Sequence, residues 1–204
     1  YSFEKTAGEK SLSFWVGDGS DDIEVTSNTL SADTWYHVVG TNDGTTSKIY
    51  VNGSLANATA QGSPAGPTGN LKIGMHSEQT ASSRYWNGKI DEVAIWNDAL
   101  TAAEVTALFN SGNPLTASSN SGDYTSSANI KGYWRFGENT GTKAHDLSGS
   151  GNHGTISGAA YGSPGADAAG PTVSSVSSTT ADGTYNIGNV LAITVTFNEV
   201  VTVS

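Results

Sequence analysis

Cysteine is absent from this chain of 204 residues, and methionine occurs only once. Without a thiol the protein can form no disulfide, no thiolate zinc site and no cysteine nucleophile. Small secreted domains usually gain stability from disulfides. This chain must therefore rely on its apolar core, on bound metal ions or on neighbouring molecules.

Positive charge is also scarce. The sequence has 9 Lys and Arg residues against 19 Asp and Glu residues, which gives a formal net charge of −10. Nucleic acids and anionic membrane surfaces bind clusters of Lys and Arg, so we expect neither as a partner. The sequence also lacks an apolar run of the roughly 20 residues that cross a bilayer, and we expect no membrane insertion.

Glycine and short apolar segments are what the sequence does contain. Its 25 glycines fall largely between these segments, and Asn-Gly pairs such as Asn52-Gly53 favour tight hairpin turns. Short segments separated by such turns are typical of antiparallel sandwiches and barrels. The strands that we expect are residues 12–16, 22–26, 35–40, 48–51, 71–75, 89–96, 130–136, 172–178 and 190–197.

One short helix is predicted to begin after Thr101. Thr101 and Glu104 match a capping box, in which both side chains accept hydrogen bonds from free amides at the helix start. Leu108 belongs to the apolar stripe that follows, and Gly112 and Pro114 are typical helix stop signals. The sequence thus predicts an all-β fold of two antiparallel sheets with one short helix.

Several segments in the first half of the chain resemble one known family when they are taken in order. They are Trp35 to Val38, Asn42 to Thr45, Ile49 to Gly53, Leu71 to Gly74, Trp86 to Trp96 and Ala99 to Glu104. The series resembles the concanavalin A-like laminin G modules of bacterial and phage surface proteins. The resemblance implies a jelly-roll sandwich, often with a bound calcium, that binds carbohydrate or protein outside the cell. It does not fix the ligand, because this fold hosts many functions.

The second half of the sequence departs from the usual order of that family. Tyr133 to Phe136 and the Gly-rich stretch Asp146 to Gly154 resemble the opening of the same module, although here they follow the helix. Pro171 to Phe197 resembles the first strands of an Ig-like repeat of bacterial adhesins. We expect a laminin G-like sandwich without its N-terminal part (1–115), a linker (116–129), a strand and Gly-rich loop that complete the sandwich (130–160), a second linker (161–171) and an incomplete Ig-like domain (172–204).

The displaced strand needs a partner, because a strand with three large aromatic side chains is not stable alone in water. The resemblance places Tyr133 to Phe136 beside Asp91 to Trp96. We expect this pairing within one molecule, since the segment 116–129 is long enough to let the strand return. Pairing with a neighbouring copy is the alternative, and it would produce a polymer.

No set of residues predicts catalysis. Glycosidases need two carboxylates that face one cleft, but Asp91 and Glu92 are adjacent and point to opposite faces of a strand. His145 and His153 flank the Gly-rich loop, but their spacing does not support a zinc site. The protein is therefore predicted not to be an enzyme.

Two sets of residues are candidates for binding. Asp146 and Asn152 of the Gly-rich loop, with Asp91 from the neighbouring strand, could supply some of the about six to eight oxygens that calcium takes. The alternative is that Asp146 and Asn152 only form turns. Tyr85 and Trp86 lie beside a predicted turn and form the expected ligand-binding surface, although aromatic residues of strands more often lie in the core.

Three functions fit these features. The first is a secreted, cell-surface or virion-surface binding and adhesion module, with a glycan, a surface protein or neighbouring copies of itself as partner. The second is a structural subunit of a fibre, filament or phage appendage. The third is an accessory domain of a glycosidase. The sequence favours the first, since it carries candidate binding residues and lacks a paired set of catalytic acids.

Overall fold

The computed structural model divides into two compact units, Tyr1–Ala166 and Asp167–Ser204, and each is described by itself. Within these units the structure describes residues 2–4, 10–17, 22–60, 64, 69–75, 85–138, 140–162, 173–178 and 193–197. The described residues form antiparallel strands and a single α-helix. The predicted all-β class with one short helix is therefore confirmed.

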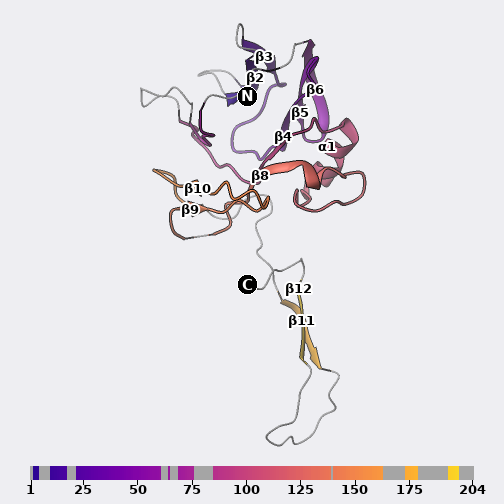
Figure 1. Cartoon of the computed structure of the whole chain (residues 1–204), viewed down its shortest axis with the longest axis vertical. Coiled ribbons are helices and arrows are strands. Elements are labelled where there is room, and N and C mark those ends of the chain that lie inside the picture. Colours follow the sequence, from indigo (N-terminus) through magenta and orange to yellow (C-terminus); the bar gives the residue numbers. More distant parts are fainter. Residues whose placement is uncertain are drawn as a thin grey trace, which may run out of the picture. The chain divides into compact units, whose positions relative to one another are not determined.

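The first unit contains two three-stranded antiparallel sheets (Figure 1). The first sheet has the order β1 (Ser2–Glu4), β2 (Ser13–Gly17) and β3 (Asp22–Thr26), and the second has the order β4 (Val38–Asn42), β5 (Thr46–Val51) and β6 (Ser54–Ala60). Hairpin neighbours in sequence are neighbours in each sheet. This is the arrangement that short strands joined by tight turns favour.

Strands β4 and β5 are covered on both faces, because successive side chains of a strand point to opposite sides. Ile49 packs with Phe14 and Val25 of the first sheet, and all three are buried. The next residue, Tyr50, belongs to a second core on the opposite face. Gly40 allows the close approach of the two sheets, since a Cβ atom there would lie 2.6 Å from the ring of Phe14.

Helix α1 (Ala102–Phe109) covers the second core, where its Leu108 is buried. The predicted capping box is confirmed. The Glu104 N–H donates to the Thr101 hydroxyl (3.3 Å), and the Thr101 N–H donates to the Glu104 carboxylate (3.0 Å). A 3₁₀ turn, η1 (Asn110–Gly112), follows the helix near the predicted stop. No helix among the described residues is long and apolar enough to cross a membrane.

Strand β8 (Ile130–Trp134) pairs with β7 (Val93–Trp96) of the same molecule. The predicted partner of the displaced strand is therefore confirmed, and the pairing is intramolecular. Tyr133 is fully buried in the second core. The indole of Trp134 folds back over Gly132, where the Cβ atom of any other residue would overlap the ring.

The segment 116–129 is folded onto the second core, which corrects the prediction of a linker. Ala117 and Tyr124 are buried there, and the Tyr124 hydroxyl donates to the Ala117 carbonyl (2.6 Å). The Trp96 indole donates to the same hydroxyl (2.9 Å). A 3₁₀ turn, η2 (Ser127–Asn129), then leads directly into β8. One buried tyrosine thus holds a segment whose other residues are mostly small and polar.

The Gly-rich loop lies between two very short strands, β9 (Lys143–Ala144) and β10 (Gly154–Thr155), which pair with each other. At the start of this loop the Leu147 N–H donates to the Tyr133 carbonyl (2.8 Å). This contact places the loop along the edge of β8 that faces away from β7. The loop therefore continues the β7–β8 pair on its open side.

Some strands differ from the prediction. Residues 71–75 form no strand, and Met75 makes only an isolated bridge with Tyr85. Strands β4 and β7 begin later than predicted. Glu92, just before β7, has a positive φ of 52°, which strand residues do not adopt. The sequence does not predict β6, because this edge strand is mostly exposed and lacks β-branched apolar residues.

The second unit contains an antiparallel pair, β11 (Val173–Ser178) and β12 (Ile193–Phe197). Both strands lie within the predicted ranges. The other residues of the predicted Ig-like domain, 172–204, lie outside the described residues, as does most of the predicted linker 161–171. The Ig-like assignment therefore stays a prediction.

Candidate functional site

Two neighbouring aromatic side chains, Tyr85 and Trp86, lie on the surface shortly before β7. Tyr85 is 58% exposed and Trp86 is 40% exposed. The Trp86 N–H donates to the Gly74 carbonyl (2.8 Å), and Tyr85 bridges to Met75, so an adjacent segment holds the backbone of both residues. Their location on the surface agrees with the sequence analysis, whereas their ligand-binding role stays a prediction.

Gly88 lies against the indole ring of Trp86 at its Nε1 atom. A Cβ atom on Gly88 would lie 2.9 Å from the indole Nε1, so the ring packs directly on the backbone of the turn. Asn87 and Lys89 are exposed on either side of this glycine. The turn thus presents one supported aromatic surface with an amide and an ammonium group beside it, which suits a ligand with an apolar face and a polar rim.

Asp146 organises the Gly-rich loop through its carboxylate. Oδ1 accepts the N–H groups of Tyr133 and Ser148 (2.9 Å each), and Oδ2 accepts that of Asn152 (2.8 Å). The amide group of the Asn152 side chain donates to the Lys131 carbonyl (2.8 Å). Since Lys131 and Tyr133 lie on the outer edge of β8, the two loop side chains take the place of a further strand.

The Asp146 carboxyl group is buried and remains ionised. Burial raises its pKa, but hydrogen bonds from Ser148, Tyr133 and Asn152 together outweigh this effect and hold the pKa below its usual range. The backbone of Asn152 is engaged as well, because the Trp134 indole donates to its carbonyl (3.0 Å). The carboxylate of the loop is therefore committed to local structure.

The predicted calcium ligands Asp91, Asp146 and Asn152 all form hydrogen bonds within the protein. Three backbone N–H groups already point at the Asp146 oxygens, and a cation would have to displace donors of positive partial charge. Asp91 accepts the N–H of Glu92 (3.0 Å). The described residues contain no group of three or more His, Asp or Glu residues arranged to hold a metal. A calcium site of Asp91, Asp146 and Asn152 thus stays a prediction.

The two histidines beside the loop are close together. Their ring centroids are 5.4 Å apart, and the rings are inclined at 70°. The Nδ1 atom of His153 accepts the N–H of Asp146 (3.1 Å), so in the neutral ring the proton lies on Nε2. That proton occupies the nitrogen which would otherwise be free to bind a metal. This tautomer disfavours a shared zinc ion between His145 and His153.

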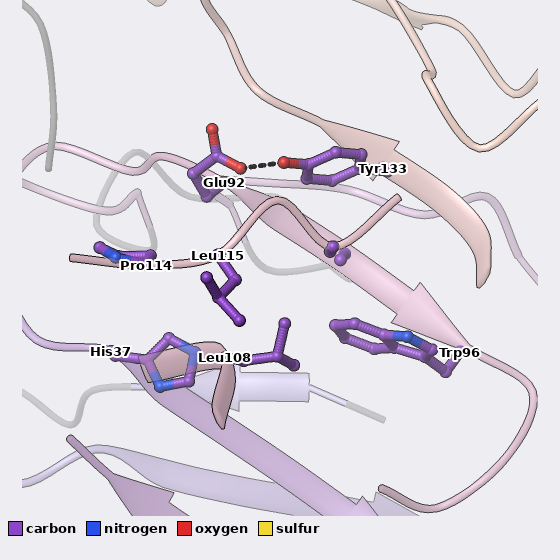
Figure 2. Close-up of a pocket in the computed structure, with 9 residues that line it drawn as sticks. His37, Glu92, Trp96, Leu108, Pro114, Leu115 and Tyr133 are labelled. Carbon is purple, nitrogen blue, oxygen red and sulfur yellow. Dashed lines mark hydrogen bonds between the residues drawn. The ribbon is translucent and has the colours of Figure 1, made fainter. Parts of the chain in front are cut away.

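A small cavity lies between α1 and the β7–β8 pair (Figure 2). Its volume is about 40 Å³, which is room for a water molecule or two and not for a sugar ring. The residues that line it are His37, Glu92, Ala94, Trp96, Leu108, Pro114, Leu115, Ala117 and Tyr133. The cavity is therefore a gap in the second core and not a ligand pocket.

The polar side chains that line this cavity either form hydrogen bonds or are buried without a partner. The Tyr133 hydroxyl donates to Glu92 (Figure 2), and Arg135 Nε donates to the other carboxylate oxygen of Glu92 (2.8 Å). Burial, reinforced by the charge of Glu92, raises the pKa of Tyr133. His37 Nδ1 is buried without a hydrogen-bond partner among the described residues, and burial lowers its pKa to about 4. His37 is therefore neutral near pH 7.

Comparison with known families agrees with this sandwich. Residues 1–106 match a laminin G family model described as the concanavalin A-like lectin/glucanases superfamily. The protein belongs to this superfamily. The matched region covers both three-stranded sheets and most of α1. Strand β8 and the Gly-rich loop lie beyond it and nevertheless pack onto the concanavalin A-like domain.

Two solved structures are similar to this protein at low sequence identity. A candidate carbohydrate-binding protein from Bacteroides ovatus is 22% identical with a TM-score of 0.53, over 72% of this sequence and 42% of that one. An S-layer domain-containing protein from Clostridium thermocellum is 24% identical with a TM-score of 0.34, over 48% of this sequence and 50% of that one. The present sequence thus spans half or less of each structure. No curated protein matches it.

The hydrogen-bonded group of Glu92, Tyr133 and Arg135 in the concanavalin A-like domain is not indicated by any local pattern in the sequence. Glu92 and Arg135 are 43 positions apart and meet only because β7 pairs with β8. The predicted pairing of these strands could have indicated the contact, since it brings the residues before β7 close to those after β8. The charge on Glu92 is therefore compensated by an arginine that is distant in the sequence.

Proposed function

We propose that this concanavalin A-like domain is a non-catalytic module that binds carbohydrate at a cell or virion surface through Tyr85 and Trp86. The exposed aromatic pair carries this proposal, because the indole is supported on Gly88 and open to solvent. Covering an exposed ring with the apolar face of a sugar removes both surfaces from water. Asn87 and Lys89 can meet the hydroxyl groups at the rim of the sugar.

Membership of a superfamily that includes lectins and glucanases leaves binding and hydrolysis as alternatives. A glycosidase needs a carboxyl group whose pKa is raised, so that it can act as general acid. Asp146 and Glu104 are the buried acids of the described residues, and hydrogen bonds lower the pKa of both, in Glu104 to about 2. Neither of these two acids has the raised pKa of a general acid, which is consistent with a binding role.

The shared fold of the candidate carbohydrate-binding protein from Bacteroides ovatus is consistent with this proposal. The strongly negative net charge favours a partner other than nucleic acid or an anionic membrane. A protein without cysteine has no disulfides. At a cell or virion surface its stability must therefore come from its core. The two cores on either side of β4 and β5 meet that condition.

The test is a glycan array probed with the full-length protein, followed by titration of the glycans that bind. We expect Trp86→Ala to weaken binding at least tenfold, which is about 1.4 kcal/mol. Trp35→Ala is the matched control, because Trp35 is exposed to a similar extent, 43%, and it should bind as the parent does. Equal loss in both variants would contradict a site at Trp86.

Two further measurements separate the alternatives. Release of reducing ends from a bound polysaccharide would show hydrolysis and contradict a purely binding role. Absence of any glycan ligand, together with concentration-dependent filaments in sedimentation, would favour the structural subunit of a fibre or filament.

A further inference from the structure

The sequence contains two Asn-Gly pairs, Asn52-Gly53 and Asn87-Gly88, and the fold treats them in opposite ways. Asn52 lies in the turn between β5 and β6 and is fixed on both sides. The His37 N–H donates to its side-chain Oδ1 (3.0 Å), and its own N–H donates to the His37 carbonyl (2.8 Å). Its side chain is therefore held in one position.

Gly53 is fixed as firmly as the asparagine before it. It is buried, and its carbonyl accepts a hydrogen bond from the Thr106 hydroxyl of α1 (2.9 Å). The ring of Phe109 lies 2.9 Å from the place of a Cβ atom on Gly53. The peptide between Asn52 and Gly53 thus cannot rotate without moving the helix.

Asn87-Gly88 lacks the hydrogen bonds that hold Asn52-Gly53, although Gly88, like Gly53, lies against an aromatic ring. Both residues are exposed and lie outside the helices and strands. Among the described residues, none makes a hydrogen bond to the Asn87 side chain. The backbone hydrogen bond that Trp86 donates to Gly74 holds the turn on one side only. The amide of Asn87 and the following peptide are therefore free to approach each other.

We propose that Asn87 is a site of spontaneous deamidation and that the fold protects Asn52 from the same reaction. The backbone nitrogen of Gly88 loses its proton to base and attacks the amide carbon of the Asn87 side chain, Cγ. A new bond between this nitrogen and Cγ closes a five-membered succinimide as the bond between Cγ and Nδ2 breaks, and Nδ2 takes the proton back from the base and leaves as ammonia. Water then opens the ring at one carbonyl or the other and yields aspartate or isoaspartate. No oxidant or reductant takes part, and glycine presents no side chain to hinder the attack.

The product alters the surface beside Trp86. Either product adds one negative charge, and isoaspartate also lengthens the backbone by one carbon between Trp86 and Gly88. Since the indole rests on Gly88, the longer backbone moves its support. A loss of carbohydrate binding with age follows from this change and rests on the proposed function, whereas the deamidation itself does not.

The test is to age the full-length protein in mildly alkaline buffer and to follow both asparagines by peptide mass mapping. We expect the Asn87 peptide to convert at least tenfold faster than the Asn52 peptide. In urea-denatured protein the two should convert at similar rates, because only the fold distinguishes them. Equal rates in the folded protein, or the same inequality in urea, would overturn the proposal.

The variant Asn87→Gln separates the modification from its consequence, because glutamine cyclises far more slowly. Aged parent should bind the array-selected glycan more weakly than fresh parent, while aged N87Q should keep the affinity measured for fresh N87Q, whatever its difference from the parent. Conversion of Asn87 without loss of binding would remove the functional consequence and leave the site. If no glycan binds at all, the proposed function fails and the mass measurement still decides the site.

Discussion

Two loops of similar composition, 116–129 and 145–153, each form hydrogen bonds with one buried carboxylate. Both are rich in small polar residues, which is typical of linkers. Glu104 holds the first loop and Asp146 the second, and the two residues are 5% and 6% exposed. The comparison shows that a polar segment can be an integral part of a domain when buried side chains anchor it: a carboxylate in both loops, and Tyr124 as well in the first.

The two carboxylates work from different places. Glu104 belongs to α1 and accepts hydrogen bonds from the Thr125 hydroxyl (3.2 Å) and the Ser126 hydroxyl (2.5 Å) of the loop, besides capping its own helix. Asp146 belongs to the loop itself and accepts the backbone N–H groups of Tyr133, Ser148 and Asn152. The first loop is thus held from outside, whereas the second holds itself and the edge of β8 together.

The largest effect is expected from separating the second loop and β8 from the core. Trp134 is 5% exposed and donates its indole N–H to the loop. Trp134→Asp should lower the free energy of unfolding by about 3–5 kcal/mol, because it buries an unpaired charge and removes a large apolar side chain. Urea denaturation followed by circular dichroism measures this change.

Trp86→Asp is the matched control for that variant. Trp86 is 40% exposed, so its replacement should change the free energy of unfolding by no more than about 0.5 kcal/mol. A Trp134→Asp variant that unfolds at the same urea concentration as the parent would show that β8 does not close the domain.

A smaller loss in the free energy of unfolding is expected when the hydrogen bonds between Glu104 and the first loop are weakened. Hydrogen bonds lower the pKa of Glu104 from its usual 4.5 to about 2, against a burial effect that raises it. The shift corresponds to about 3 kcal/mol of stability. Because the folded pKa is the lower one, this stability is fully present above pH 4.5 and disappears as the pH falls toward 2. Unfolding measured across this range should show a smaller slope in Glu104→Gln than in the parent, and the remaining slope should come from other carboxylates of lowered pKa such as Asp146.

His37 provides a separate window that tests the assignment. Burial lowers its pKa from 6.5 to about 4, so the stability that depends on the neutral ring is lost as the pH falls from 6.5 to about 4. Below that pH, His37 causes no further loss of stability. An acid slope confined to the higher window would contradict the role of Glu104. The same slope in Glu104→Gln as in the parent would do so as well.

The sequence predicts the strands and the helix better than it predicts the roles of the loops. Turn chemistry and the capping box are local signals, and they predict most of the strands and the start of α1 correctly. The pairing of β7 with β8 follows from the family resemblance. The burial of Tyr124 depends on contacts with Trp96 and Ala117 that no local pattern encodes. Composition alone therefore suggested a linker where the segment forms part of the core.

Sequence and geometry lead to different expectations for the second loop, and calcium distinguishes them. The sequence predicts that Asp91, Asp146 and Asn152 bind calcium, in which case a chelator should lower the melting temperature and added calcium should restore it. In the structure three backbone N–H groups already donate to the Asp146 carboxylate. We therefore expect no change in the melting temperature with either reagent. Asp146→Ala should cost about 1–3 kcal/mol through the amides left unpaired, and this cost should be the same with and without chelator. A cost that vanishes in chelator would establish the metal site, because Asp146 would then matter only when calcium is bound.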